Sequence, residues 1–242
     1  QLRAAQILGP TNEKTLSQAR VFIPRDEEKQ KKRGSLLLIL SLKSSAEKLE
    51  PDWGKELLTR FQEEYYGQTE GWPMEKIAAS LKKIAREVEE SNLPFQFEAV
   101  AAVLWQKVWY FASWGKGKVL VRRGPTMAAA LVGKEGEVVS SSGPAEAGDL
   151  VLLGSDDFFT ALENEEVSKI MDLKSEEEIA EAFSTAIAKK EVAGSLAALI
   201  ARLAPEEKEE IEETPSKKEK KPFLTRYQGK IKKYGRWGLI LV

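Results

Sequence analysis

Residues 148–157 read GDLVLLGSDD, from Gly148 to Asp157, and this stretch decides the fold. A Gly-Asp turn leads into an almost wholly apolar run, which predicts a strand buried on both faces. The run ends in two adjacent carboxylates, Asp156 and Asp157. Acids at a strand end are a common way to hold a hard cation at the rim of a sheet. The alternative, that they form a turn or cap the following helix, is the more frequent role of a strand-end Asp.

The composition allows a sizeable hydrophobic core and limits the types of side chain that could take part in catalysis. Of the 242 residues, 42% are hydrophobic, which is enough for a large domain that folds without help. Lys and Arg number 37 against 38 Asp and Glu, so we expect no nucleic-acid partner. The chain has no Cys and no His, which excludes disulfides, thiol nucleophiles and imidazole catalysis. Any catalysis would use carboxylates, Lys, Arg, Tyr, hydroxyls or an oxygen-ligated metal.

Hydrophobic periodicity predicts strands and two helices in the first third of the chain. Residues 36–42 form an apolar run that fits a fully buried strand. Apolar residues then recur at helical spacing over 51–67 and again over 71–90. Earlier in the chain, 19–24 predicts a short edge strand, and the charged run 25–33 predicts a solvated loop.

The middle of the chain predicts an antiparallel meander of short strands, separated by turns that are rich in Gly and Pro. The expected strands are 100–104, 108–113, 119–122, 127–132, 138–140 and 150–153. Helical patterns return after them: Asn164 is expected to cap a short helix, and Ser175 with Glu178 forms a capping box. A last apolar run, 196–203, predicts a closing strand. This order predicts an α+β fold with two antiparallel sheets packed face to face and helix pairs outside.

Three segments, in this order, resemble the PPM-type metal-dependent Ser/Thr protein phosphatase family over roughly residues 8 to 203. Ala112–Gly124 resembles the family's Gly-Asp-Ser-Arg segment with the strand and Arg-x-Gly that follow it. Gly148–Asp157 resembles its Gly-Asp-x-x-x-Leu-x-Ser-Asp-Gly segment, and Leu196–Leu203 resembles its closing strand. The resemblance implies a four-layer αββα sandwich whose strand-end acids hold a pair of Mn²⁺ or Mg²⁺ ions. In that chemistry a bridging water attacks a phosphoserine or phosphothreonine.

Most of the family's metal ligands are missing at the matching positions. Only Asp156 falls on a ligand position, and Asp157 replaces the usual Gly. Other acidic motifs of the family fall on Ser41-Leu42, Asn12-Glu13-Lys14, Gly115-Lys116-Gly117-Lys118 and Gly194-Ser195. Two divalent ions need several carboxylates. We therefore expect no cofactor, or at most weak metal binding at Asp156 and Asp157.

This pattern predicts a degenerate, pseudophosphatase-like protein that is catalytically inactive and acts as a regulatory module binding a protein or phosphoprotein. Lys116, Lys118 and Arg122 are the candidate phosphate-binding residues, although solvated hairpin charges are the more frequent role of such a cluster. The alternative is an active Mn- or Mg-dependent protein Ser/Thr phosphatase whose ligands the sequence motifs do not reveal.

The C-terminal segment differs in composition from the rest of the chain. We expect the phosphatase-like domain over 1–204, a charged flexible linker over 205–229, and a basic and apolar tail over 230–242. The tail is rich in Lys and Arg and ends in an uncharged run. This favours the cytoplasmic flank of a membrane helix that follows Val242, which would tether the domain on the cytoplasmic side. An ordinary basic tail or an added edge strand is the alternative.

Overall fold

The stretch from Gly148 to Asp157 forms the buried strand that its sequence predicts. In the computed structural model of the chain, β7 spans Leu150–Gly154, and all of its residues are buried. β7 pairs antiparallel with β5 on one side and with β8 on the other. Its side chains meet protein on both faces of the sheet, which is why the run shows no polar alternation.

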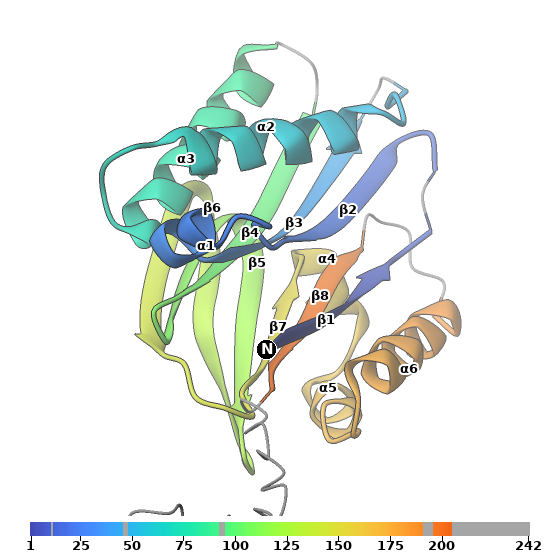
Figure 1. The fold of residues 1–242 in the computed structure, drawn as a ribbon. Coiled ribbons are helices and arrows are strands. Elements are labelled where there is room, and N and C mark those ends of the chain that lie inside the picture. Colours follow the sequence, from blue (N-terminus) through green and yellow to red (C-terminus); the bar gives the residue numbers. More distant parts are fainter. Residues whose placement is uncertain (11, 46–47, 92–94, 191–195, 205–242) are drawn as a thin grey trace, which may run out of the picture. The chain divides into compact units, whose positions relative to one another are not determined.

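The structure describes residues 1–204 apart from 11, 46–47, 92–94 and 191–195, and the fold is α+β (Figure 1). The other strands are β1 (Leu2–Leu8), β2 (Thr15–Phe22), β3 (Ser35–Ser44), β4 (Phe95–Trp105), β5 (Val108–Arg123), β6 (Thr126–Pro144) and β8 (Ala197–Leu203). The helices are α1 (Glu27–Arg33), α2 (Trp53–Gly67), α3 (Pro73–Glu90), α4 (Asp156–Ala161), α5 (Asn164–Ile170) and α6 (Glu176–Ala188). The predicted linker, 205–229, and tail, 230–242, lie outside the described residues.

Hydrogen bonds join the strands into one antiparallel sheet, whereas we expected two. The order is β1-β8-β7-β5-β4-β3-β2, and β6 pairs with β5. The ladder is continuous because β5 is shared: its first half pairs with β4 and its second half pairs with β7. One long strand therefore holds both halves of the sheet in a fixed register.

Two of the Gly-rich segments between the predicted short strands, 115–117 and 133–136, do not turn the chain, whereas Gly124-Pro125 forms the turn between β5 and β6. The expected strands 108–113 and 119–122 are two halves of β5, and 127–132 and 138–140 both belong to β6. Gly115 has a φ of +90°, and the β5–β6 register shifts on both sides of it. A Cβ on Gly133 would lie 2.2 Å from the Gly115 carbonyl oxygen. Glycine is needed here because two backbones approach closely within a bulged ladder.

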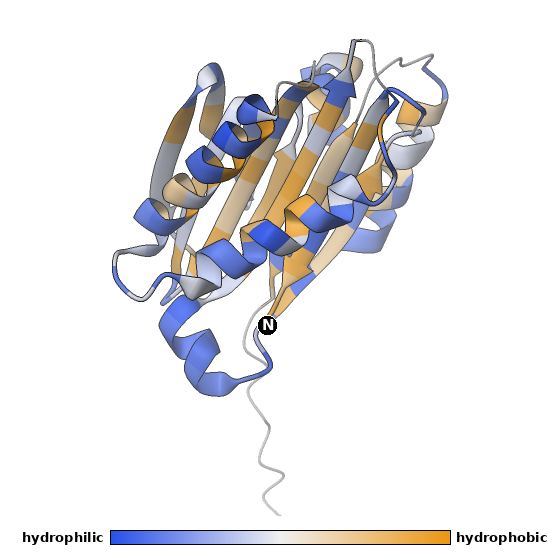
Figure 2. Ribbon diagram, turned by 90° about the horizontal axis from the view of Figure 1, so that it is seen from above, coloured by the Kyte–Doolittle hydropathy of each residue, from blue (hydrophilic) through white to orange (hydrophobic). Residues whose placement is uncertain are grey.

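Three apolar clusters hold the elements together. α2 and α3 pack on the β2–β3–β4 half of the sheet through a cluster that includes Phe61. α4, α5 and α6 pack on the β1–β8–β7 half through a cluster that includes Phe183. A third cluster, here called the inter-half cluster, joins residues of both halves, such as Val100 and Leu199. The two halves therefore pack face to face, and Figure 2 shows the hydrophobic residues concentrated along the central strands.

The helical predictions are confirmed for α2, α3 and α6, and the closing strand is confirmed as β8. The prediction of a loop over 25–33 was wrong, because Glu27–Arg33 forms α1 with Asp26 as its N-cap. None of the residues of α1 is buried, so no apolar periodicity marks this helix in the sequence. Asn164 is the first residue of α5 and does not cap it; the N-cap is Glu163.

In the part of the chain that the structure describes, no helix combines the length and the apolar character that crossing a membrane requires.

Candidate functional site

Asp156 and Asp157 lie where β7 ends and α4 begins. The interpretation that either aspartate caps the helix was wrong, because the N-cap is Ser155, whose Oγ accepts a hydrogen bond from Phe158 N at 3.4 Å. The same Oγ accepts from Ala197 N at 3.2 Å, which ties this turn to β8. The two aspartates occupy the first turn of α4, where free backbone N–H groups favour negative charge.

Asp157 forms an ion pair with Lys43, which lies near the end of β3. The Lys43 Nζ is 2.6 Å from Asp157 Oδ1, and the side chains are 38% and 20% exposed, respectively. The second oxygen, Asp157 Oδ2, is buried and has no hydrogen-bond partner among the described residues. A cation belonging to the protein therefore neutralises the carboxylate that follows the central strand.

Glu98, on β4, brings a third carboxyl group to the same place. Both of its carboxyl oxygens accept the backbone N–H of Asp156 at 3.1 Å, and the Ser41 hydroxyl donates to Oε2 at 3.5 Å. Burial raises the pKa of Glu98 from 4.5 to about 7. The negative charges of Asp156 and Asp157 contribute to this raised pKa, while the Asp156 N–H and the Lys43 charge oppose the shift. We call Lys43, Glu98, Asp156 and Asp157 the rim site.

The glycines of β5 make room for Glu98. A Cβ on Gly115 would lie 3.0 Å from Glu98 Cγ, and a Cβ on Gly117 would lie 3.2 Å from Glu98 Oε1 and 2.9 Å from the Gly154 carbonyl oxygen. The Gly-x-Gly spacing thus leaves space on one face of β5 for the carboxyl group and for the end of β7. The nearest atom to a Cβ on Gly117 would be Val100 Cγ2, at 2.4 Å, so a larger residue there would first have to displace a side chain of β4.

A cavity of about 300 Å³ adjoins the rim site and is lined by both charged and aromatic residues. The aromatic part of the lining comes from Phe95, Phe97 and Trp114. Its charged part comes from Lys43, Glu89, Glu98, Lys116, Glu135 and Asp156. Lys116 is paired with Glu135 at 3.0 Å. Among the described lining residues, both cations therefore already face a carboxylate.

The structure does not bring the three predicted phosphate-binding residues together. Lys116 lines the cavity beside the rim site, and the Lys118 ammonium lies over the Phe159 ring, 5.6 Å from its centroid. Arg122 lines a separate cavity of about 240 Å³, where it donates to Ser168 O at 3.1 Å and pairs with Asp172. Arg122 is thus tied to α5 and to the turn that follows it, and lies outside the cavity that Lys116 lines.

Comparison with solved structures shows which known fold this arrangement has. The catalytic domain of the serine/threonine phosphatase PstP, in complex with two manganese ions, superposes with a TM-score of 0.65 at 13% identity, covering 84% of this chain and 99% of that one. The chain has the fold of PPM-type phosphatases. Stp1 from Staphylococcus aureus gives 0.65 at 11% identity, with 85% and 96% of the two chains covered.

A third similar structure is PppA, a key regulatory component of the T6SS in Pseudomonas aeruginosa, with a TM-score of 0.59 at 11% identity over 83% of this chain and 97% of that one. No protein-family model and no curated protein matches the sequence. The likeness to PPM-type phosphatases is therefore one of fold, and it confirms the fold that the three sequence segments imply.

The described residues do not fit the pair of metal ions that this fold implies. Although Glu98, Asp156 and Asp157 lie near one another, neither they nor any other three Asp, Glu, His or Cys side chains among the described residues are arranged so that they could hold a metal ion. Asp157 is neutralised by Lys43, and both oxygens of Glu98 are directed at a backbone N–H. Glu13, from the Asn-Glu-Lys segment, pairs with Lys48 at 2.8 Å. The segment Gly194-Ser195 lies outside the described residues.

Sequence reasoning missed Glu98 and Lys43. Glu98 lies on the part of β4 that precedes the predicted strand 100–104, and its only signal is a single acid inside an apolar run. Lys43 follows Ser41-Leu42 by one residue, and nothing in the local sequence indicates that it reaches an aspartate 114 positions later in the chain. Both contacts depend on the pairing of β3 with β4 and of β5 with β7.

The raised pKa of Glu98 predicts a pH-dependent stability. In the unfolded chain the carboxyl titrates near 4.5 and in the folded chain near 7, so the folded state binds the proton more tightly. The contribution is fully present below pH 4.5 and is lost as pH rises through 7. The free energy of unfolding should fall over this window by at most about 3 kcal/mol relative to a Glu98→Gln variant.

Urea denaturation of the wild type and of Glu98→Gln at a series of pH values measures this difference. Glu90→Gln, at the end of α3, serves as a control because it changes an exposed glutamate. Equal pH profiles for wild type and Glu98→Gln would show that the carboxyl is ionised normally in the folded protein.

Proposed function

We propose that this chain is a catalytically inactive, protein-binding regulatory module built on the PPM phosphatase fold. The observation that carries the proposal is the ion pair between Lys43 Nζ and Asp157 Oδ1, at 2.6 Å. It places a fixed positive charge at the rim where strand-end acids would otherwise be available to a divalent cation. PppA, which has a similar fold, is described as a key regulatory component of the T6SS, which supports a regulatory role but does not bear on catalysis.

Electrostatics disfavours a divalent ion beside this pair. A charge of +2 placed about 4 Å from an ammonium group meets a repulsion of roughly 2 kcal/mol in bulk water and roughly 8 kcal/mol at an effective dielectric of 20. Because the pKa of Glu98 is raised to about 7, this carboxyl group is only partly ionised near neutral pH. The rim site therefore supplies too little negative charge to offset the dehydration of Mn²⁺ or Mg²⁺.

The test of inactivity is a phosphatase assay with a phosphothreonine peptide in millimolar Mn²⁺ or Mg²⁺, run beside the catalytic domain of PstP. We expect turnover no greater than that of an Asp156→Ala variant, and no saturable heat on titration with MnCl₂. Turnover well above background that Asp156→Ala abolishes would instead establish the alternative, an active metal-dependent phosphatase.

The chemistry of the cavity favours a particular kind of partner. No lining cation that the structure describes is without a carboxylate neighbour, whereas the acids Glu89 and Asp156 also face the cavity. Phe95, Phe97 and Trp114 add an apolar wall. We expect a protein segment that presents a basic residue beside an apolar one, because such a segment would bury apolar surface and pair its charge. A phosphorylated segment would have to displace Glu135 from Lys116.

A matched peptide panel tests this preference by fluorescence anisotropy. The peptides carry Arg, Ala or phosphoserine next to Leu in an otherwise constant frame. We expect the Arg peptide to bind most tightly and to lose about fivefold or more in affinity with Asp156→Asn. The control Asp52→Asn changes an exposed aspartate at the start of α2. Preferential binding of the phosphoserine peptide, lost with Lys116→Ala, would support a phosphoprotein partner and contradict the basic one.

A further inference from the structure

Three arginines lie in one row across the sheet, on the face that α5 and α6 cover. Arg122 on β5 lies directly opposite Leu150 on β7, and Leu150 lies opposite Arg202 on β8. On the far side of β8, Arg202 lies opposite Arg3 on β1. Directly opposed residues of an antiparallel pair share one face of the sheet, and like charges placed opposite each other destabilise it. The row therefore requires negative charge close by.

The cavity of about 240 Å³ that Arg122 lines is also lined by Arg202, and Leu150 lies between the two arginines. Neighbouring strands are about 4.8 Å apart, so the Cα atoms of the two arginines are separated by roughly 10 Å. Two side chains of this length can converge on one small group that is bound above Leu150. Sites for drug-sized molecules have volumes of about 300 to 1,000 Å³, so this cavity favours a smaller ligand.

The acids beside the row balance only part of its positive charge. Glu176 pairs with Arg202 and its side chain is 3% exposed, whereas Asp172 pairs with Arg122 and its side chain is 58% exposed. Arg3 forms no ion pair with any residue that the structure describes. Three guanidinium groups therefore meet two carboxylates, and the exposed pair contributes little because water screens it. An anionic ligand that replaced Asp172 would be bound by the charge of the row.

Arg202 keeps hydrogen-bond donors that no described residue uses. Its Nε donates to the Glu176 carboxylate, and no further hydrogen bond of its guanidinium group occurs among the described residues. Its Nη2 is buried, which leaves Nη1 as the nitrogen that can meet a ligand. A guanidinium group carries its donors in a planar fork that matches the oxygens of a phosphoryl group. The charge and the donors at this cavity therefore suit an oxyanion.

We propose that this cavity binds a dianionic phosphoryl group, held above Leu150 between Arg122 and Arg202. The phosphoryl group displaces the exposed Asp172 carboxylate from Arg122, while the buried Glu176 stays paired with Arg202. The site lies beside the first residue of β7, whereas the rim site follows the last residue of that strand. The two cavities share no lining residue, so this site is independent of the proposed protein-binding role.

Isothermal titration calorimetry of the full chain with inorganic phosphate, at constant ionic strength, tests this proposal. We expect saturable binding that Arg122→Gln weakens by about tenfold or more. The double variant Arg202→Gln with Glu176→Gln removes both charges of the buried pair, so neither is left uncompensated, and it should weaken binding to a similar extent. Asp172→Asn removes the competing carboxylate and should instead strengthen binding by about two- to fivefold.

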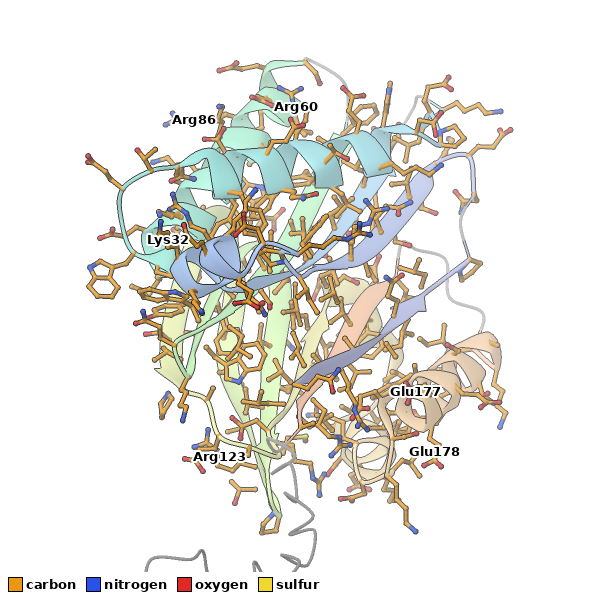
Figure 3. The ribbon with its side chains drawn as sticks, viewed as in Figure 1. Lys32, Arg60, Arg86, Arg123, Glu177 and Glu178 are labelled. Atoms are coloured by element: carbon orange, nitrogen blue, oxygen red, sulfur yellow. The ribbon has the colours of Figure 1, made fainter. Side chains whose placement is uncertain are left out.

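The matched control is Arg86→Gln, which removes an exposed arginine of α3 that Figure 3 labels. It should leave the affinity for phosphate unchanged. Thermal unfolding without phosphate checks that each variant is folded. The absence of saturable binding overturns the proposal, and so does an affinity that a folded Arg122→Gln variant keeps. An affinity that Asp172→Asn leaves unchanged or lowers contradicts the displacement of Asp172 and overturns the proposed geometry.

A second titration identifies the source of the phosphoryl group. It compares free phosphoserine with a peptide that carries phosphoserine, each with the wild type and with Arg122→Gln. Tighter binding of the peptide, weakened by Arg122→Gln, assigns the site to a phosphorylated protein segment. Equal binding of both, weakened by the same substitution, assigns it to a small phosphorylated molecule or to phosphate itself. Either result supports the site, whereas insensitivity of both ligands to Arg122→Gln overturns it.

Discussion

The ion pair between Lys43 and Asp157 joins the end of β3 to the first turn of α4, and the rim site is arranged around it. Asp157 lies 20% exposed with one oxygen buried and unpaired, so loss of the ammonium would leave a poorly solvated charge. Glu98 meets the same constraint in another way, since burial raises its pKa to about 7. One acid is therefore paired with a cation, and the other holds its proton to a higher pH than an exposed glutamate does.

This local chemistry depends on the continuity of the sheet. Gly115 and Gly117 of β5 lie against Glu98, and the residues of β5 that follow them pair with β7, which ends just before Asp156. Because β5 spans both halves of the sheet, the positions of β4 and β7 are fixed relative to each other. The same continuity places two arginines on either side of the first residue of β7. One uninterrupted ladder thus fixes the surroundings of both ends of β7.

Much of the fold can be predicted from the sequence, because apolar periodicity reports burial directly. The buried strands β3, β7 and β8, and the amphipathic helices α2 and α3, all follow from it. α1 has no buried residue, so its sequence shows no apolar periodicity. The glycines inside β5 and β6 look like turn residues in the sequence, although in the structure they allow two backbones to approach closely. The rim site was predicted only through its aspartates. Lys43 and Glu98 come from other strands, and their roles exist only after long-range pairing.

The account rests on the claim that Lys43 already occupies the position of a cation, and diffraction from a crystal soaked in MnCl₂ tests this most directly. The predicted result is an intact Lys43–Asp157 contact and no anomalous scattering peak for manganese at the rim site. A pair of manganese peaks bridged by Asp156 and Asp157, with the Lys43 side chain turned away, would contradict it.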